Sequence, residues 1–413
     1  MGQSSRDHTA SGASRRARVP RQATGPHDPG GQAAADAASG PRRGLASGVT
    51  LYDVASLAGV STATVSRVVH GMDRVAESTR ARVLAVIEQL GYVPDGAAQS
   101  LSRRRKDVIG LVGVERSDAT KLQYDHEAMS LLFYDEVLRG VEARLRHQNW
   151  SLLITYLDGE SDFMARLLSL SGKVDGLLIG EGIVPSSAIA RLAGRLPLVV
   201  VAGNPRVHVA DVVSADNRSG TAALVVHLIE VHDRRRLYYV DGPSTAPDAA
   251  ERRRAFDQVI RSHPGCQLAG SSQGQFTVAS GEEAGRQLLA DDELPDAVVC
   301  ANDQMAIGLL LAFARANVQV PEDVAVVGFD DIFPASLCDP PLTTVHQPMR
   351  LLGERACDRL LDRIASPDLP PRVELLPTEL VLRSSCGCPP GTMIRQPARR
   401  QRGGRRLSTA ATT

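Results

Sequence analysis

Hydrophobic residues recur at helical spacing in three consecutive stretches of residues 49–91. In the first stretch, apolar positions at three-to-four spacing follow Thr50, which is placed to cap a helix, and Gly59 then permits a sharp turn. Ser61 is placed to cap a second helix, and a third helical stripe covers Glu77–Leu90. The pattern predicts a small all-α unit that contains a helix-turn-helix, with a generic two-helix hairpin as the alternative.

From residue 108 onward, short apolar runs bounded by glycine, proline and aspartate replace the helical stripes. Helical stretches such as Asp135–His147 and Thr221–His232 separate these runs. Alternation of this kind is typical of parallel sheets that helices cover on both faces. About 280 residues are too many for one sheet, so two Rossmann-like lobes are expected. The expected strands lie within residues 108–112, 150–156, 174–180, 196–202, 236–242, 297–300 and 324–328.

The formal net charge of zero hides a segregation of charge along the chain. Residues 1–49 carry +4, residues 50–106 carry +3, residues 107–388 carry −13 and residues 389–413 carry +6. A basic head on an acidic body favours contact with phosphates at the head. Residues 1–48 and the tail have no periodic apolar face, and we expect both to be disordered. For residues 1–48 we favour a passive tail. The alternatives are a source of nonspecific attraction to DNA and a leader that precedes the true start.

The sequence contains no run of about eighteen apolar residues and no apolar signal segment, so neither a membrane span nor secretion is expected. The chain should then be cytoplasmic, with its six cysteines reduced. Cys386 and Cys388 are too close together for a zinc finger and lack a second pair, and the ten histidines do not cluster. No metal, no cofactor and no catalytic motif are therefore predicted, which argues against an enzyme.

Motifs at fixed spacing cover the head, and further motifs follow in the body. The head holds V-T-L-Y-D-V-A, G-V-S, T-V-S-R-V-V and L-G-Y-x-P, and P-D-G-A-A-Q-S-L follows at residues 94–101. F-D-D-I-F and P-P-L-T-T-V-H-Q-P lie within residues 329–348. In these motifs the sequence resembles the LacI/GalR family of bacterial transcription regulators over residues 49–386. The resemblance implies a small all-α helix-turn-helix DNA-binding domain and an α/β core of two Rossmann-like lobes, similar to type I periplasmic binding proteins.

The resemblance also divides the chain and implies three chain crossings between the lobes, near residues 232, 321 and 348. No leucine heptad follows Arg383, so a homodimer is expected, and two heads on a two-fold axis should read a palindromic operator. The implied divisions are a disordered basic extension at 1–48, the helix-turn-helix domain at 49–93, a hinge helix and linker at 94–106, a two-lobed effector-binding and dimerisation domain at 107–388 and a disordered basic tail at 389–413.

The resemblance assigns DNA contacts residue by residue. Thr62, Ala63 and Arg67 fall where the family reads base edges, and Arg67 suits guanine because its guanidinium fork matches O6 and N7. Ala98 and Leu101 match the hinge residues that enter the minor groove. Solvation on an exposed helix face is the alternative role for each polar residue. The residues implied to contact the DNA backbone are Thr50, Tyr52, Ser61, Thr64, Ser66 and His70.

The family's effector lies between the lobes, at the carboxyl ends of the strands. Carboxylates with one arginine and flanking aromatic rings suit a polyhydroxylated ring, so we expect a sugar or sugar derivative as the effector and not a purine. Packing or helix capping is the alternative role for the aromatic residues and the strand-end aspartates. The implied effector-binding residues are Phe133, Tyr134, Asp216, Arg252, Phe276, Asn302 and Asp303.

A ligand-responsive repressor is the function that these features predict. Its expected partners are double-stranded DNA with a palindromic operator, a carbohydrate effector and a second copy of the chain, without a membrane. The two-lobed body alone would also permit a solute-binding transport protein. The head and the lack of an export signal argue against that alternative.

Overall fold

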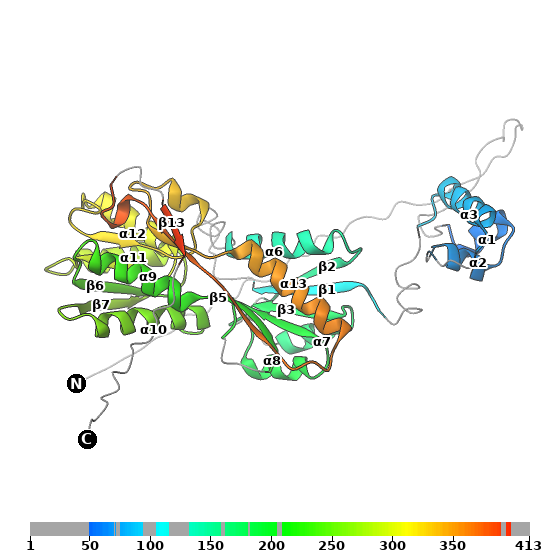
Figure 1. Ribbon diagram of the computed structural model, residues 1–413, viewed down its shortest axis with the longest axis horizontal. Helices are drawn as coiled ribbons and strands as arrows, with labels where there is room; N and C mark the ends of the chain where they lie inside the picture. Colours follow the sequence, from blue (N-terminus) through cyan, green and yellow to red (C-terminus); the bar gives the residue numbers. More distant parts are fainter. Residues whose placement is uncertain are drawn as a thin grey trace, which may run out of the picture. The chain divides into compact units, whose positions relative to one another are not determined.

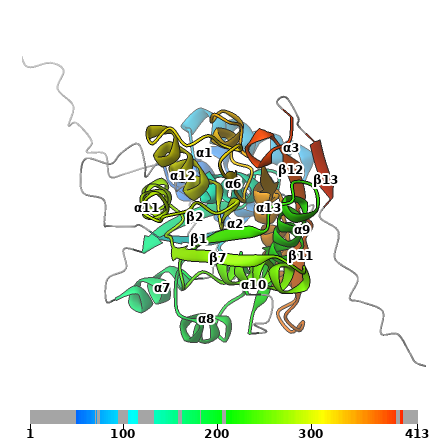
Figure 2. The same cartoon turned by 90° about the vertical axis from the view of Figure 1, so that its left-hand side faces the viewer.

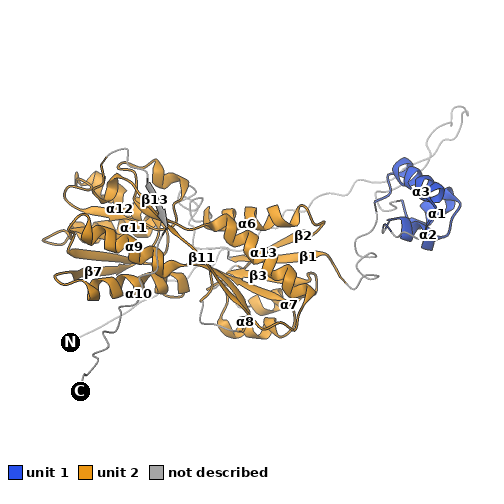
Figure 3. Cartoon of the chain, viewed as in Figure 1, with its two compact units in different colours: residues 1–94 blue, residues 95–413 orange. Residues whose placement is uncertain are grey.

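The computed structural model describes residues 49–69, 71, 75–93, 105–114, 132–157, 162–180, 182–204 and 209–389, together with the backbone of 394–397. The chain forms two compact units, residues 1–94 and 95–413, which we call the head and the body and describe separately (Figure 3). None of the described helices is long and apolar enough to cross a membrane. The predictions for residues 1–48, His70, Ala98 and Leu101 lie outside the described residues.

The described residues of the head form three helices: α1 Leu51–Ala58, α2 Thr62–Val69 and α3 Glu77–Leu90. Thr50 caps α1 as expected, because its hydroxyl accepts the Asp53 N–H while the Asp53 carboxylate accepts the Thr50 N–H at 2.8 Å. Gly59 follows α1 with a φ of 64°, a left-handed conformation that suits glycine. The predicted helix-turn-helix is confirmed.

Apolar side chains from all three helices meet in one small hydrophobic core of the head. Val54, Val65 and Val83 are fully buried, and Tyr92 packs against the same core after α3 ends. Burial of these residues fixes which side of α2 faces inward. The opposite side of α2 is left for other contacts.

The first lobe of the body is a parallel six-stranded sheet in the order β11-β5-β4-β3-β1-β2. Its strands are β1 Val108–Val114, β2 Ser151–Leu157, β3 Gly176–Gly180, β4 Leu198–Val201, β5 Asp211–Ala215 and β11 Val373–Leu376. Figure 1 shows its helices on the two faces of the sheet: α6 Leu132–Leu145 with α13 Met349–Ala365, and α7 Phe163–Ser171 with α8 Ser186–Ala193.

Alternation of side chains along each strand explains why both faces need helices. In β3, Leu178 packs in the same cluster as the buried residues of α6 and α13. Leu177 and Ile179, which point the other way, pack with the buried residues of α7 and α8. Val199 and Val200 divide in the same manner in β4. Runs that are apolar at every position therefore form the buried parallel strands that the sequence predicts.

The second lobe contains a parallel four-stranded sheet in the order β7-β6-β8-β9, and Figure 2 views the body from this side. Its strands are β6 Arg236–Asp241, β7 Gln267–Gln273, β8 Ala297–Cys300 and β9 Ala325–Val327. Its helices are α9 Asn217–Glu230, α10 Pro247–Ser262, α11 Val278–Leu289 and α12 Asp303–Arg315. An antiparallel sheet adds β10 Thr344–His346, β12 Glu379–Leu382 and β13 Ile394–Pro397, and the 3-10 helices are η1 Phe333–Ser336 and η2 Ser384–Cys386.

The chain crosses between the two lobes three times, but only one crossing lies where it was expected. β5 belongs to the first lobe and α9 packs against α10, so the first crossing is at Asp216 and not near residue 232. The crossing near Pro348, between β10 and α13, is confirmed. The last crossing joins β11 to β12 at residues 377–378, whereas residue 321 lies inside the second lobe. The other two positions, implied by the resemblance, were wrong, and the hydrophobic pattern could not correct them because a change of sheet leaves no local mark in it.

A short piece of the C-terminal tail belongs to the fold. The expected disorder of residues 389–413 is wrong for Ile394–Pro397, which form β13 and pair antiparallel with β12. Backbone hydrogen bonding can hold such a segment even where its sequence is too polar to suggest a strand.

Candidate DNA-binding and effector sites

The second helix of the head presents the expected base-reading residues on its outer side. Ala63 and Arg67 are exposed and lie one turn apart on α2, and Thr62 is half-buried. Val65 and Val68 face the hydrophobic core instead. The helix thus offers one guanidinium among small side chains, a surface that fits a major groove.

Of the residues expected at DNA phosphates, Thr50, Tyr52, Ser61 and Thr64 lie at the starts of α1 and α2. The Thr64 N–H donates to the Ser61 hydroxyl at 3.2 Å, while Thr50 caps α1. Tyr52, in the first turn of α1, is 76% exposed, and Ser66 is half-buried on α2. Because the first turn of a helix attracts anions through its N–H groups, the backbone there also favours phosphates.

Arg252, on α10, is the centre of the candidate effector site in the body. Its side chain is 2% exposed, and its guanidinium donates to the Asn217 side-chain oxygen at 2.9 Å and to the Ala301 carbonyl at 2.6 Å. The carboxylates of Asp248 and Asp330 lie 3.4 Å and 3.5 Å from its terminal nitrogens. A buried cation is thereby paired with two carboxyl groups and held by neutral acceptors.

Aromatic rings and unusual backbone conformations accompany this arginine. The Arg252 guanidinium carbon lies 3.7 Å from the centre of the Phe329 ring and 6.0 Å from that of Phe276. Phe276 has a φ of 59° and Asp330 a φ of 129°, both costly for residues with a side chain. A Cβ at Gly242 would lie 2.4 Å from the Phe276 ring, so only glycine leaves room for it. Backbone strain of this kind concentrates at binding sites.

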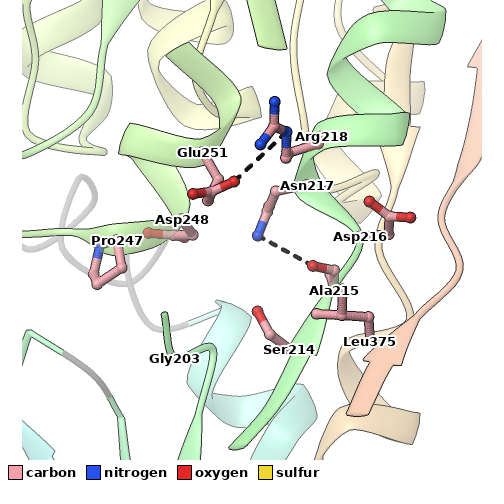
Figure 4. A pocket seen from close by; sticks show the side chains of 10 residues that line it. All are labelled: Gly203, Ser214, Ala215, Asp216, Asn217, Arg218, Pro247, Asp248, Glu251 and Leu375. Atoms are coloured by element: carbon pink, nitrogen blue, oxygen red, sulfur yellow. Dashed lines mark hydrogen bonds and ion pairs between the residues drawn. The ribbon is translucent and has the colours of Figure 1, made fainter. Parts of the chain in front are cut away.

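A shallow pocket is lined by Asn217 and Asp248, two of the partners of Arg252 (Figure 4). Ser214 and Asp216 contribute to it from the carboxyl end of β5, and Asp248 and Glu251 contribute from the start of α10. The pocket therefore lies where strand ends of the first lobe meet helix starts of the second. Its carboxylates are acceptors for hydroxyl groups.

A second and wider opening is also lined by both lobes. Glu136 of α6 lines it together with Asp330 and Gln347 of the second lobe, and the Gln347 amide donates to the Asp330 carboxylate at 2.6 Å. Burial raises the pKa of Asp330 well above its ordinary value, and the Arg252 guanidinium opposes this effect. Since Asp248 lines the pocket of Figure 4 and Asp330 lines the second opening, Arg252 connects the two hollows.

Asp303 does not line either hollow, although it was expected to bind the effector. Its side chain is fully buried, and its carboxylate accepts the Thr344 hydroxyl at 2.5 Å and the Ile332 N–H at 3.0 Å. Ile332 lies two residues after Asp330, so Asp303 supports the loop that carries Asp330. Burial raises the pKa of Asp303 to about 7, against the opposing effect of its two hydrogen bonds.

The raised pKa of Asp303 makes stability depend on pH. Because the folded chain holds this proton more tightly than the unfolded chain, the free energy of unfolding should fall as pH rises from about 4 to about 7. Asp303→Asn keeps an oxygen for the Ile332 N–H and cannot ionise, so it should gain stability relative to the parent across this window. Urea unfolding at several pH values measures the difference in the free energy of unfolding. If this free energy changes with pH in the same way in both proteins, the raised pKa of Asp303 is contradicted.

Two of the other expected effector residues cap helices. The Asp216 carboxylate accepts the Ser219 N–H at 3.1 Å at the start of α9, and Asp216 also lines the pocket of Figure 4. Asn302 caps α12 by accepting the Met305 N–H at 3.0 Å, and its amide donates to the Phe276 carbonyl at 3.3 Å. The structure thus joins Asn302 to the aromatic side of the Arg252 cluster.

The first-lobe aromatics pack against each other. Phe133 and Tyr134 stand edge to face at the start of α6, with ring centres 5.3 Å apart. Sequence reasoning missed Asp330 and Gln347 as members of the site, although both lie in the quoted motifs F-D-D-I-F and T-T-V-H-Q-P. The motifs carried the signal, but only the fold shows that these side chains reach Arg252 or its partner.

Contrary to expectation, two of the histidines do cluster, and the two neighbouring cysteines do have a second pair of potential ligands. His227 and His232 have ring centres 4.9 Å apart, and both lie beside Cys386 and Cys388. The expectation was wrong because about 150 residues of sequence separate the two pairs.

Comparison with known proteins matches each of the two units to a known family of domains. Residues 50–95 match the family model described as bacterial regulatory proteins, lacI family, and residues 225–386 match a periplasmic binding protein-like domain. The Ribose operon repressor of Escherichia coli (strain K12) is 34% identical over 335 residues, which cover 79% of this chain and 97% of that protein. The chain belongs to the lacI family of bacterial regulatory proteins. Another relative, the HTH-type transcriptional repressor PurR of Photobacterium profundum, is 31% identical over 81% of this chain and 98% of its own length.

Solved structures of lacI-family proteins agree with this assignment. The lac repressor dimer bound to operator and the anti-inducer ONPF superposes with a TM-score of 0.72 at 27% identity, covering 82% of this chain and 99% of that one. The complex of the transcriptional regulator CelR with cellobiose gives a TM-score of 0.58 at 32% identity, and the match covers 82% of this chain and 99% of CelR. This lacI-family protein is therefore a DNA-binding repressor with an effector-binding core, and not an enzyme.

Proposed function

We propose that this lacI-family repressor binds a palindromic operator as a homodimer and that a sugar or sugar derivative in the interlobe cleft switches it. The buried Arg252–Asp330 pair, flanked by Phe276 and Phe329, carries the proposal. Carboxylates accept hydrogen bonds from sugar hydroxyls, a guanidinium donates to their oxygens, and an aromatic ring covers the apolar face of a sugar ring. Two relatives support this class of effector: one is named for the ribose operon, and the CelR structure contains cellobiose.

The effector site in this proposal has more members than the sequence indicated. Asp330 and Gln347 supply polar groups at the opening between the lobes, and Asp303 acts through the Asp330 loop. Arg252 lies between the two hollows as the central donor. Asp303 stays in the proposal as a positioning residue and not as an effector contact. The other residues implied by the sequence remain proposed effector contacts: Phe133, Tyr134, Asp216, Arg252, Phe276 and Asn302.

The DNA-binding assignment follows the exposed face of α2. Arg67 reads a guanine, Ala63 offers a methyl group to a thymine, and Thr62 contacts a neighbouring base edge. Ala98 and Leu101 in the hinge enter the minor groove. Backbone contacts come from Thr50, Tyr52, Ser61, Thr64, Ser66 and His70.

The proposed domains are the head at 49–93, the hinge at 94–106 and the effector-binding and dimerisation domain at 107–388. A regulator of this kind works in the cytoplasm, on the nucleoid. The effector has different affinities for the two arrangements of the lobes, so its binding shifts the dimer between a state that holds the operator and one that releases it.

Selection of DNA sites from a random pool with the full-length chain tests the proposal. We expect a two-fold symmetric site, and we expect that one sugar from a panel changes how tightly the protein binds it. A palindrome that no sugar affects would overturn the sugar assignment and leave the repressor intact. An asymmetric site or no enriched site would overturn the proposed dimeric operator recognition.

Asp330→Asn should weaken binding of the effective sugar by about 10–100-fold, because a charged hydrogen bond contributes about 1.5–3 kcal/mol. Isothermal titration with the sugar measures the affinity, and operator binding without sugar should stay within about two-fold of the parent. Asp291→Asn, at an exposed position, is the matched control. Equal sugar affinity in Asp330→Asn and the parent would place the effector elsewhere.

A further inference from the structure

Four side chains that the DNA and effector sites do not use meet at one point of the second lobe. His227 lies in the last turn of α9, and His232 follows the end of this helix. Cys386 ends η2, and Cys388 lies two residues later. The potential ligand atoms of these four residues all lie within 4.8 Å of one another.

The distances within this cluster match those between the ligands of one tetrahedral zinc ion. With Zn–N bonds of about 2.0–2.1 Å and Zn–S bonds of about 2.3 Å, two nitrogens should lie about 3.3 Å apart and a nitrogen and a sulfur about 3.6 Å apart. The two histidine Nε2 atoms are separated by 3.1 Å. The His227 Nε2 lies 3.7 Å from the Cys386 Sγ and 3.5 Å from the Cys388 Sγ, and the His232 Nε2 lies 3.5 Å from the Cys388 Sγ.

The surroundings also suit metal ligands. Cys386 is fully buried, and the Thr343 hydroxyl donates to its sulfur at 3.1 Å, as outer hydrogen bonds to metal-bound thiolates do.

Gly387 shapes the loop between the two cysteines. It has a φ of 110°, which disfavours other residues, and a Cβ there would lie 3.0 Å from the His232 Nδ1. The C-G-C spacing therefore lets the backbone pass close to the His232 ring. Both sulfurs reach the histidines from the same short loop.

We propose that His227, His232, Cys386 and Cys388 bind one Zn²⁺ ion as a structural site. Two thiolates and two imidazoles in tetrahedral arrangement favour zinc over hard cations such as magnesium, and four protein ligands leave no position for a reacting molecule. Each thiol loses its proton to solution when it binds the metal. The ion joins the end of α9, which follows the first crossing between the lobes, to the chain that follows the last crossing.

Metal analysis of the untagged full-length chain, purified under reducing conditions, tests the proposal. We expect about one zinc per chain, and loss of most of it in Cys388→Ser and in His232→Gln. Cys266→Ser and His263→Gln are matched controls, because these residues lie outside the cluster, and both should keep the zinc. Metal content that does not distinguish the two sets of variants would overturn the proposal.

Two measurements on the parent protein do not depend on the folding of any variant. Removing the metal with a chelator should lower the thermal midpoint by on the order of 5–10 °C, and added Zn²⁺ should restore it. Cobalt substituted for zinc should show the intense visible absorption of a tetrahedral ion with thiolate ligands. A metal-free parent that takes up no zinc, or a cobalt spectrum of an octahedral ion, would overturn the proposal.

Discussion

Replacing Arg252 with methionine should lower the free energy of unfolding of the body by about 3–5 kcal/mol. The guanidinium is 2% exposed and balances Asp248 and Asp330, so its removal leaves buried carboxylates without their cation. The Asn217 oxygen and the Ala301 carbonyl lose their donor as well. Urea unfolding of the full-length chain, followed by circular dichroism, measures the loss.

The control for this experiment is Arg261→Met, on the exposed side of the same helix, which should change stability by less than about 1 kcal/mol. The pH dependence gives a second check. A carboxyl whose pKa is raised in the folded chain destabilises it less as pH falls, so part of the loss in Arg252→Met should be recovered at acidic pH. A loss as small as that of Arg261→Met would show that the buried pairing contributes little.

Arg67→Ala should reduce affinity for the selected operator by about 1–3 kcal/mol, or roughly 5–150-fold, through loss of a bidentate contact to guanine. Arg67 is exposed on α2 and contributes nothing to the buried core of the head, so the variant should fold normally. Fluorescence anisotropy against the operator and against unrelated DNA measures both affinities. Discrimination between the two DNAs should fall, and not only overall binding.

Arg67→Lys separates charge from geometry. Lysine keeps the positive charge but lacks the planar fork, so nonspecific binding and its dependence on salt should persist while specificity falls. Arg82→Ala, at an exposed position of α3, is the control for a general loss of charge. If Arg67→Lys binds the operator like the parent, Arg67 contacts phosphate and not a base.

The head could be predicted almost completely from the sequence because its structure is local. The cap at Thr50, the turn at Gly59 and the apolar stripe of α3 each depend on residues within one or two turns. Most buried strands of the body were predicted for a similar reason, since an apolar run between glycine and aspartate has few alternatives in a protein of this size, but the buried strand β5 was not among them. By contrast, β7 was missed because Gln267–Gln273 is a polar edge strand with an internal glycine.

Sites that join distant parts of the chain were the hardest to predict. Arg252 was singled out, but its partner Asp330 comes 78 residues later, and no periodicity records that contact. The resemblance implied an effector contact for Asp303, yet its side chain lies under the loop of Asp330. The histidine–cysteine cluster was excluded because residues 227 and 386 are neighbours only in the folded chain.

The pairing of β5 with β11 restricts how the lobes can move. These strands lead into the first and the last crossing and remain hydrogen-bonded up to the crossing itself. The Asp216 N–H donates to the Leu376 carbonyl at 2.8 Å, and the Thr378 hydroxyl donates to the Asp216 carbonyl at 3.2 Å. Sliding one lobe past the other would break these bonds, whereas rotation about an axis through the paired segments keeps them. A lobe movement that keeps these bonds is therefore a hinge rotation in which the two segments bend together, and not a slide of one lobe past the other.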